Sequence, residues 1–240
     1  PDRQGWFVQV IENKYPAFSE GACKIFHNEG PYKKMDGVGN HEVVITRDHN
    51  RSIAEFTLEE SKLLFEAYIQ RFCALKNQMC LDYIFIFHNH GPESGASIAH
   101  PHSQIIGLPV IPPGIKRSLD GSRNYFQSHK RCAHCDIIRF ERTAKKRVVY
   151  ENKDFLVICP FASKTAFEMR LFPKTHQSNF EDLESAKVGA LGDALQKSLL
   201  KLFRGLQNPS YNFFIHTAPL GKNGIHSHYH WHIEILPKTS

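Results

Sequence analysis

Residues 91–109 read GPESGASIAHPHSQIIGLP, and this stretch carries the strongest prediction of fold and chemistry in the chain. At its centre, residues 100–104 read HPHSQ. In an extended segment, side chains two positions apart share a face, so we expect His100, His102 and Gln104 to point the same way. The apolar residues that follow predict a strand that continues from this motif.

Small residues precede the two histidines and predict a loop that can hold a phosphate. Gly91, Gly95, Ala96 and Ser97 offer positions where a backbone can approach a phosphate closely and donate N–H groups to it. An imidazole beside such a loop favours nucleophilic attack on phosphorus, with His102 as the candidate nucleophile. The alternative is an ordinary strand that carries two incidental histidines.

This stretch resembles the active-site motif of the galactose-1-phosphate uridylyltransferase family, a branch of the histidine-triad superfamily. The likeness extends to residues 89–91 (NHG), 95–97 (GAS) and 104–106 (QII). The resemblance implies that His102 is the nucleophile that carries the nucleotidyl group, and that His100 is a zinc ligand. It further implies substrate contacts from Asn89, Gly95, Ala96, Ser97 and Gln104, of which Ser97 and Gln104 would meet the transferred phosphate.

One further substrate contact is expected near the start of the chain, where a strand at residues 6–11 runs into the segment 12–17, ENKYPA. In the resembled family a segment of this type lines the nucleotide pocket, which makes Asn13 a candidate nucleoside contact. The alternative is a strand end terminated by Pro16.

The order of predicted elements occurs twice, which indicates an internal duplication. In the first half, residues 41–46 (HEVVIT) predict a strand, a helix begins after Thr57 with Glu60 completing a capping box, and residues 83–87 (YIFIF) predict a buried strand. In the second half, the matching segments are 167–172 (FEMRLF), a long helix opened by 180–183, the strand 211–215 (YNFFI) and the closing motif 230–237 (HWHIEILP).

The fold class predicted from this repeat is α+β, with two tandem halves that each pack a helix on an antiparallel sheet. The histidine-triad fold that the resemblance implies has this layout. We place the boundary after the prolines at 109, 112 and 113, so that residues 1–113 form the half with the HPHSQ motif. Residues 114–240 form the second half.

The second half offers a complete set of ligands for a metal ion. Cys132 and Cys135 form a CxxC, which we expect to be a tight chelating turn. His176 follows a predicted strand, and His230 opens the closing motif. Two thiolates and two imidazoles match a closed tetrahedral zinc site. Two alternatives stay open, a redox-active cysteine pair and free structural thiols.

In the first half, the matching histidines are His49 and His100, and no CxxC precedes them. The resembled family carries a CxxC upstream of this point, so we expect the chain to be truncated at both ends relative to the family. His49 and His100 are then half of a metal site. Without thiolates, they are a hydrogen-bonded pair that supports His102.

Four further histidines occur at every second position, at 226, 228, 230 and 232. If the segment is a strand, all four face one way. By repeat His232 matches the nucleophile, but Glu234 replaces the glutamine, and a carboxylate repels a phosphate. We therefore do not expect His232 to accept the nucleotidyl group. His226 and His228 either approach the substrate phosphates or belong to a solvated polar loop.

Composition limits the classes of partner. The chain has 240 residues, 41% hydrophobic and 22% charged, with a formal net charge of +6. This is an ordinary globular composition with no membrane span, and its scattered basic residues do not predict nucleic-acid binding. Cys23, Cys73, Cys80 and Cys159 are isolated in sequence, so we expect free thiols, and with a metal site favoured over disulfides we expect a reducing, cytoplasmic location.

The predicted activity is a ping-pong nucleotidyl transfer in carbohydrate (galactose) metabolism, with a nucleotide sugar and a sugar 1-phosphate as substrates. By resemblance, a uridylyl group passes from UDP-glucose to galactose 1-phosphate through a nucleotidyl-histidine, with structural zinc and a homodimeric assembly. Because Ser103 gives the motif the form HxHSQ, an adenylyl-transferring ADP-sugar phosphorylase is an alternative. A different class of alternative is a non-catalytic protein that binds zinc and nucleotides.

Overall fold

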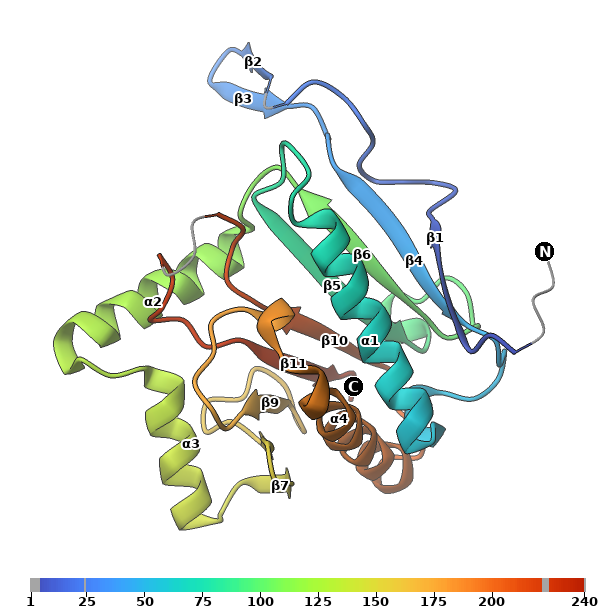
Figure 1. The fold of residues 1–240 in the computed structure, drawn as a ribbon, viewed down its shortest axis with the longest axis vertical. Coiled ribbons are helices and arrows are strands. Elements are labelled where there is room, and N and C mark those ends of the chain that lie inside the picture. The colour runs from blue at the N-terminus through green and yellow to red at the C-terminus, as the bar shows by residue number, and fades with distance from the viewer. Residues whose placement is uncertain (1–4, 24, 222–224, 240) are drawn as a thin grey trace.

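The structure is a computed structural model that describes residues 5–23, 25–221 and 225–239. It is an α+β fold, as predicted, built on a nine-stranded antiparallel sheet with a separate two-stranded hairpin (Figure 1). The strands are β1 (Val8–Glu12), β2 (Phe26–Glu29), β3 (Tyr32–Met35), β4 (Asn40–Thr46), β5 (Tyr83–His90), β6 (His102–Leu108), β7 (Val148–Glu151), β8 (Phe155–Ile158), β9 (Met169–Pro173), β10 (Tyr211–His216) and β11 (His232–Pro237). The α-helices are α1 (Leu58–Leu75), α2 (Pro113–His129), α3 (Ala133–Ala144) and α4 (Ser185–Gly205).

The sheet is continuous across the two halves of the sequence. Its strand order is β1-β4-β6-β5-β10-β11-β9-β8-β7, so the halves meet where β5 pairs with β10. From this junction outward the order runs β5, β6, β4 on one side and β10, β11, β9 on the other. The predicted duplication is therefore visible as two similar half-sheets joined edge to edge. The division after residue 113 stays a proposal, and it coincides with the first residue of α2.

The two long helices, α1 and α4, lie side by side across one face of the sheet (Figure 1). Helix α1 begins with the predicted capping box, in which Thr57 and Glu60 each accept a hydrogen bond from the other's backbone N–H. Both helices bury apolar side chains against the sheet, among them Phe65 of α1 and Leu195 of α4, and Trp231, just before β11, belongs to the same core. Burial of this apolar surface is the main stabilising contribution to the fold.

The opposite face of the sheet is covered only in part. Helix α3 packs Ile138 against Leu156 and Phe172 of the second half-sheet. Helix α2 packs Ile115 and Leu119 against the Tyr83 end of the junction. The first-half strands β4, β6 and β5 keep half-buried side chains on this face, and we call this region the open face.

The local structure differs at three points from the interpretations that the sequence offered. Residues 226–229 form a turn and β11 begins only at His232, so the four alternating histidines do not share one strand. The Cys132–Cys135 segment starts helix α3, with Cys132 at its N-cap, where we expected a free-standing turn. The strand that matches residues 41–46 lies one residue later than the expected 167–172. Arg170 pairs with Glu234 as Val43 pairs with Gln104, so Glu168 is the counterpart of His41.

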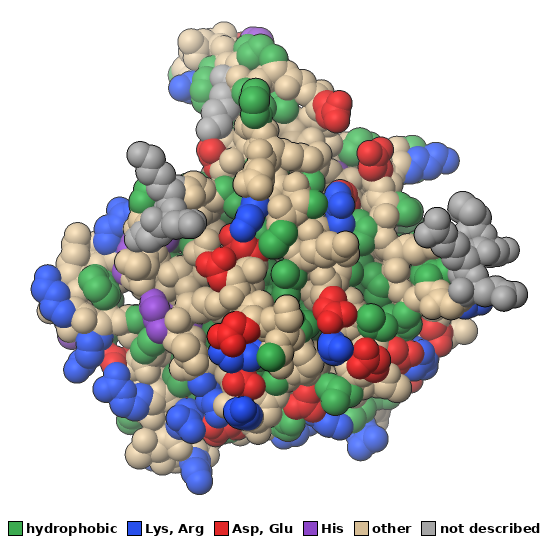
Figure 2. Space-filling view, in the orientation of Figure 1, with side chains coloured by type: hydrophobic (Ala, Val, Ile, Leu, Met, Phe, Trp, Pro, Cys, Tyr) green, Lys and Arg blue, Asp and Glu red, His purple; other side chains and the backbone are tan. Residues whose placement is uncertain are grey.

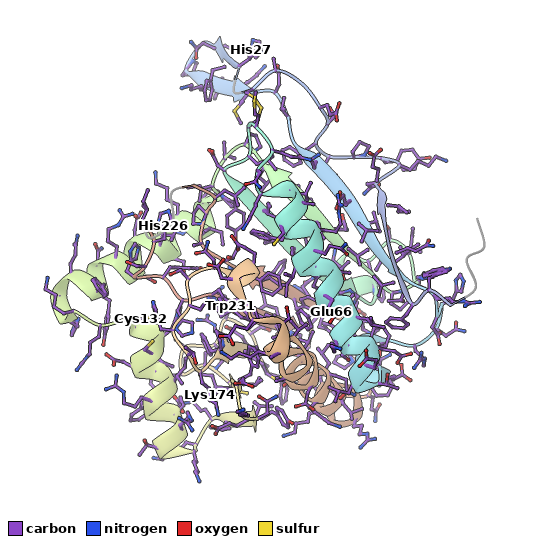
Figure 3. The ribbon with its side chains drawn as sticks, in the orientation of Figure 1. His27, Glu66, Cys132, Lys174, His226 and Trp231 are labelled. Carbon is purple, nitrogen blue, oxygen red and sulfur yellow. A yellow bond between two sulfur atoms is a disulfide. The ribbon has the colours of Figure 1, made fainter. Side chains whose placement is uncertain are left out.

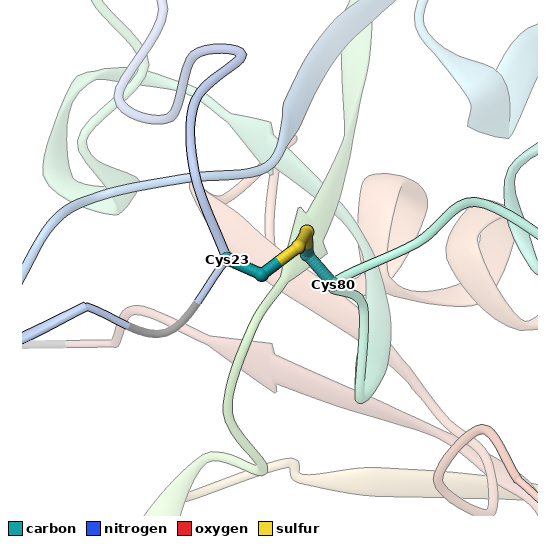
Figure 4. Close-up of a disulfide and its surroundings, with 2 residues drawn as sticks. All are labelled: Cys23 and Cys80. Carbon is teal, nitrogen blue, oxygen red and sulfur yellow. A yellow bond between two sulfur atoms is a disulfide. The ribbon is translucent and has the colours of Figure 1, made fainter.

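The expectation of free isolated cysteines is wrong for one pair, because Cys23 and Cys80 form a disulfide (Figure 4). The two residues are 57 positions apart, and their Cα atoms lie 5.2 Å apart. Cys80 lies in the connection between α1 and β5, and Cys23 lies at the base of the β2–β3 arm. Sequence spacing could not reveal this contact, because only the folded path of the chain brings the two residues together. Cys73, Cys132, Cys135 and Cys159 are free thiols.

No described helix is both long enough and apolar enough to cross a membrane. On the side that carries α1 and α4, acidic and basic side chains are interspersed, with more basic side chains toward the margin formed by α2 and α3 (Figure 2). The basic side chains therefore do not form a continuous basic surface on this side.

Candidate active site and metal centre

His102 is the first residue of β6 and lies half-buried on the open face. Its Nδ1 lies 2.9 Å from the backbone carbonyl of His100, which can only accept a hydrogen bond. Nδ1 therefore carries the proton, and Nε2 keeps its lone pair. Since no described residue hydrogen-bonds to Nε2, this nitrogen is the free nucleophilic atom of the ring.

Ser103, which lies between His102 and Gln104, points to the other face of β6, into the core. Ser103 Oγ lies 2.5 Å from the Tyr68 hydroxyl and 3.0 Å from His88 Nδ1, all three buried under α1. Burial lowers the pKa of His88 to about 3, so this ring stays neutral. Ser103 thus fixes β6 against α1 and does not face the open side of the sheet.

Gln104 shares the open face with His102, as the alternation predicted. Its side-chain Oε1 lies 2.7 Å from Nε2 of His41, the second residue of β4. We had read residues 41–46 only as a strand and gave His41 no role. The signal that could have found it is the antiparallel pairing, which sets Val43 opposite Gln104 and so puts His41 on the same face.

The loop that precedes the motif is tied to the second half of the chain. Asn89 Oδ1 accepts a hydrogen bond from Asn212 Nδ2 at 2.7 Å, and the same amide group reaches the Ser94 carbonyl at 2.8 Å. Gly91 has φ +78°, and a Cβ there would lie 2.2 Å from Ser210 Oγ, so only glycine fits. These contacts fix the bend that leads into the expected phosphate loop.

The small residues of the expected phosphate loop are accessible. Gly95 adopts the left-handed conformation at φ +85° and is exposed, and Ser97 is exposed as well. Ala96 is half-buried. The Ser97 hydroxyl makes no hydrogen bond to any described residue, so it is available to a ligand.

Asn13 lies next to the His41–Gln104 pair, which the sequence did not foresee. Its Nδ2 is 3.0 Å from His41 Nε2, its Oδ1 accepts from the Tyr15 N–H at 2.9 Å, and its own N–H donates to the His41 carbonyl at 2.9 Å. The expected nucleoside contact and the expected phosphate contact therefore meet at one imidazole.

His49 and His100 form a pair, as one of the two interpretations required. Their Nδ1 atoms are 2.8 Å apart, and His100 Nε2 donates to the Thr46 carbonyl at 2.6 Å. His100 Nδ1 is thus the lone-pair atom that faces His49. Among the described residues, no cysteine or carboxylate completes a metal-binding group with these two histidines.

Cys132, Cys135, His176 and His230 come together in the second half, as predicted; Cys132 is labelled at the start of α3 in Figure 3. Their ligand atoms lie within 4.8 Å of one another. Cys135 Sγ is 3.3 Å from His176 Nδ1 and 3.5 Å from His230 Nδ1, and Cys132 Sγ is 3.8 Å from His230 Nδ1. Tetrahedral zinc with Zn–S of about 2.3 Å and Zn–N of about 2.0–2.1 Å separates its ligand atoms by roughly 3.3–3.8 Å.

The surroundings of the two imidazoles also fit a metal. His176 Nε2 donates to the Ser227 carbonyl at 2.8 Å, and His230 Nε2 donates to the Pro173 carbonyl at 2.9 Å. Both rings therefore present the unprotonated Nδ1 to the thiols, which is the outer-shell arrangement of metal-binding histidines. A hydrogen bond from Cys135 lowers the pKa of the Cys132 thiol and outweighs burial, which would raise it, so the thiolate is favoured at this sulfur.

The second-half counterpart of the nucleophile is enclosed. His232 is 4% exposed, and its ring lies between His134 at 4.9 Å and His216 at 4.8 Å, measured between ring centroids. Burial, followed by the neighbouring His216 and His134, holds the pKa of His232 well below its ordinary value. The ring lies beneath α3, away from the open face, which agrees with the expectation that it does not accept the nucleotidyl group.

Glu234, which replaces the glutamine, is neutralised by an ion-pair network. Its Oε1 is 2.7 Å from Lys164 Nζ and 3.2 Å from Arg170 Nη2, and its Oε2 is 3.4 Å from His216 Nε2. Burial alone would raise the pKa of Glu234, but hydrogen bonds from His216 and Lys164 outweigh it and lower the pKa to about 2. The carboxylate is thus fully engaged within the protein, and its repulsion of a phosphate stays a prediction.

His226 and His228 lie in the turn before β11, close to α2 (His226 is labelled in Figure 3). Their ring centroids are 5.9 Å apart. Burial, followed by neighbouring positive charge, lowers the pKa of both rings, so both are neutral at pH 7.

Two cavities lie away from His102, one of about 780 Å³ between α3 and β8–β9 and one of about 710 Å³ behind the loop at 90–99.

Two family models match the chain, one in each half. Residues 7–111 match the N-terminal domain of a domain family of unknown function, DUF4931, and residues 118–237 match the galactose-1-phosphate uridyl transferase C-terminal domain. A galactose-1-phosphate uridylyltransferase of Thermotoga maritima is 30% identical over 233 residues, 95% of this chain and 72% of that protein. The chain belongs to the galactose-1-phosphate uridylyltransferase family.

Members of this family with different named activities are similar to the chain. An ADP-glucose phosphorylase of Arabidopsis thaliana is 34% identical over 245 residues, which span all of this chain and 68% of that protein. A crystal structure of an Arabidopsis thaliana ADP-glucose phosphorylase with bound ADP-glucose superposes with a TM-score of 0.86 at 33% identity, covering 98% of this chain and 74% of that one. The family is thus one of nucleotidyl-transferring enzymes, and its members differ in the nucleotide sugar on which they act.

Proposed function

We propose that the protein transfers a nucleotidyl group from a nucleotide sugar to a phosphorylated acceptor through a covalent nucleotidyl-His102. The observation that carries this proposal is the His102 ring itself. Its Nδ1 is fixed as a donor to the His100 carbonyl, and its Nε2 is free on the open face. A neutral imidazole with one lone pair exposed is the form of histidine that attacks phosphorus.

The reaction divides one displacement into two. In the first step, His102 Nε2 forms a bond to the α-phosphorus, and the bond from that phosphorus to the bridging oxygen breaks, so the sugar 1-phosphate leaves. In the second step, an acceptor phosphate oxygen attacks the same phosphorus, and the P–N bond breaks. The Nδ1–H···O=C hydrogen bond to His100 stabilises the positive charge that the ring acquires in the adduct.

Donors on the open face support the phosphate. The proposed contacts are the Gln104 carboxamide, the exposed Ser97 hydroxyl and the backbone of Gly95 and Ala96. Asn89 has its Oδ1 occupied by Asn212, so its NH2 is the group left for a ligand. Neutral donors fixed before the reaction stabilise the non-bridging oxygens without reorganisation.

Zinc is the proposed metal of the Cys132, Cys135, His176 and His230 cluster. When bound, it would hold the start of α3 against the strand ends as a structural ion. The two thiols must be reduced for this role. That requirement supports a cytoplasmic location, while the Cys23–Cys80 disulfide argues for a more oxidising compartment. We keep the cytoplasm as the proposed location, to be tested by counting free thiols in freshly lysed cells.

The identity of the donor is the finer part of the proposal. The uridylyltransferase relative favours UDP-glucose with galactose 1-phosphate as acceptor, and the phosphorylase relative favours ADP-glucose. Ser103, the residue that distinguishes the HxHSQ form, has its hydroxyl in the core with Tyr68 and His88. It therefore does not choose the nucleotide by direct contact. We propose UDP-glucose as the donor, with ADP-glucose as the second candidate, and a homodimer as the assembly.

The test is the intact mass of the protein after incubation with UDP-glucose or ADP-glucose, each without an acceptor. A uridylyl or an adenylyl increment on His102 establishes the chemistry and names the nucleotide. Absence of both increments, with nucleotide binding retained by calorimetry, would instead establish a non-catalytic protein that binds zinc and nucleotides. Light scattering on the same sample measures the oligomeric state.

A further inference from the structure

We propose that His41 is a positioning residue that fixes the Gln104 carboxamide with its NH2 toward the phosphate and couples it to the Asn13 loop. This inference rests on the nucleotidyl transfer proposed above. His41 stands on β4 and Gln104 on β6, and the two side chains meet on the open face, with Nε2 and Oε1 2.7 Å apart.

The protonation of His41 follows from its other nitrogen. Nδ1 lies 3.0 Å from the backbone nitrogen of Ala17, and a backbone N–H can only donate. Nδ1 is therefore the acceptor, and in the neutral ring Nε2 must carry the proton. The short contact to Gln104 is then a hydrogen bond from Nε2–H to Oε1.

This hydrogen bond sets the orientation of an amide that otherwise has two nearly equivalent positions. If the carboxamide were flipped, its NH2 would face the Nε2–H of His41, and two donors would meet. With Oε1 engaged by His41, the NH2 of Gln104 is the polar group left for the open face. A phosphate accepts hydrogen bonds, so this is the orientation that the proposed transfer needs.

The same ring joins the loop that carries the expected nucleoside contact. The Asn13 N–H donates to the His41 carbonyl, and the Ala17 N–H donates to its ring, so both ends of residues 13–17 are tied to one residue. The Asn13 Oδ1 accepts from the Tyr15 N–H, and its Nδ2 lies 3.0 Å from His41 Nε2. The imidazole therefore contacts both the Asn13 loop and the Gln104 carboxamide.

The matching position in the second half also reaches the counterpart of Gln104 on the last strand, but through an intermediate side chain. Glu168 is the counterpart of His41, since Arg170 pairs with Glu234 as Val43 pairs with Gln104. Glu168 binds Arg170 Nη2 at 2.9 Å, and Arg170 in turn binds Glu234. In the first half the residue between them is the apolar Val43, so His41 reaches Gln104 directly.

The test uses two substitutions that each keep one end of the imidazole. His41→Asn keeps an acceptor for the Ala17 N–H and loses the donor to Gln104. His41→Gln keeps a donor near the Nε2 position and loses the Ala17 tether. Two quantities are measured: the single-turnover rate of adduct formation on His102, and the nucleotide-sugar concentration that gives half of the maximal rate. The nucleotide sugar is UDP-glucose or ADP-glucose, whichever labels the wild-type protein.

We expect His41→Asn to slow adduct formation about 10- to 100-fold with little change in half-saturation. We expect His41→Gln to keep most of the rate and to raise the half-saturation concentration. In a Gln104→Ala background, His41→Asn should have no further effect on the rate, because the amide that it orients is gone. If His41 only stabilises the fold, the rate losses of His41→Asn and Gln104→Ala should multiply in the double variant. His41→Asn and His41→Gln should then also lose the same amount of rate.

If the wild-type protein forms an adduct and His41→Asn forms it equally fast, this inference is wrong while the proposed function stands. If the wild-type protein forms no adduct with either nucleotide sugar, the proposed function fails and this inference fails with it. Should the variants misfold, the ¹⁵N resonances of the His41 ring in the wild-type protein decide the matter. The proposal requires the Nε2–H tautomer, and an Nδ1–H tautomer would overturn it.

Discussion

The motif at His100–His102 and the motif at His230–His232 share a backbone arrangement and differ in what surrounds them. In both, Nδ1 of the second histidine donates to the carbonyl of the first, at 2.9 Å and 3.1 Å. In both, Nε2 of the first histidine donates to the carbonyl at the end of a neighbouring strand, that of Thr46 or Pro173. The repeat therefore preserves a way of fixing a histidine tautomer.

The difference between the two motifs is the cover over them. In the second half, α3 brings Cys132 and Cys135 to His176 and His230 and closes over His232. In the first half, His102 stays half-buried on the open face. The same strand geometry therefore leaves an enclosed histidine where a helix packs on it and an accessible histidine where the face is left open.

The largest effect that this comparison predicts is on adduct formation. His102→Asn removes the nucleophile but keeps a donor to the His100 carbonyl, so we expect complete loss of the nucleotidyl adduct with the fold intact. The matched change in the second half, His232→Asn, should leave the adduct and lower the thermal midpoint, because it perturbs a buried ring. Intact mass and thermal unfolding measure both. An adduct that survives His102→Asn would assign the chemistry to another residue.

The next effect concerns the metal. We expect one zinc ion per chain in the wild-type protein, and Cys135→Ser should lose it and lower the thermal midpoint by roughly 10 °C or more. His49→Asn is the control in the first half and should keep the full zinc content. Metal analysis after extensive dialysis gives the readout. Full zinc retention by Cys135→Ser would exclude this cluster as the site.

The two halves also differ in how they are cross-linked, and this predicts a smaller effect. Breaking the Cys23–Cys80 disulfide, by Cys80→Ser or by a phosphine reductant, should lower the free energy of unfolding by about 2–4 kcal/mol. A chelator should instead act through the second half, so the two treatments should add. Cys73→Ser, at a free thiol, serves as the control. Equal urea midpoints for Cys80→Ser and the wild type would show that the bond contributes nothing.

The smallest effect comes from the position where Gln104 and Glu234 differ. The folded-state pKa of Glu234 is about 2, against an ordinary value of 4.5, so the carboxylate contributes stability that is fully present above pH 4.5 and is lost as the pH falls through about 2. Since one pKa unit corresponds to about 1.4 kcal/mol, Glu234→Gln should lower the free energy of unfolding by at most about 3 kcal/mol at pH 7 and by much less near pH 2. Urea unfolding at several pH values tests this. A stability difference that does not change with pH would show that the ion pairs carry none of it.

Much of the fold could be predicted from local patterns. The alternating runs at 41–46, 83–87 and 211–215 became strands, and the capping box at Thr57 and Glu60 starts α1. These patterns report whether a segment has one buried face, which is a property of a few neighbouring residues. The turn at His226 and His228 could not be distinguished from a strand, because alternation of histidines resembles a strand but does not supply an apolar face.

What the sequence by itself determined is the chemical inventory: a histidine motif behind a small-residue loop, a CxxC with two distant histidines, and a duplicated order of elements. What only the tertiary structure decided is which of these groups meet and which stay accessible. The His41–Gln104 hydrogen bond, the Cys23–Cys80 disulfide and the enclosure of His232 all join residues that are far apart in the chain. Such contacts depend on strand register and on which face a helix covers, and neither is encoded in a short stretch of residues.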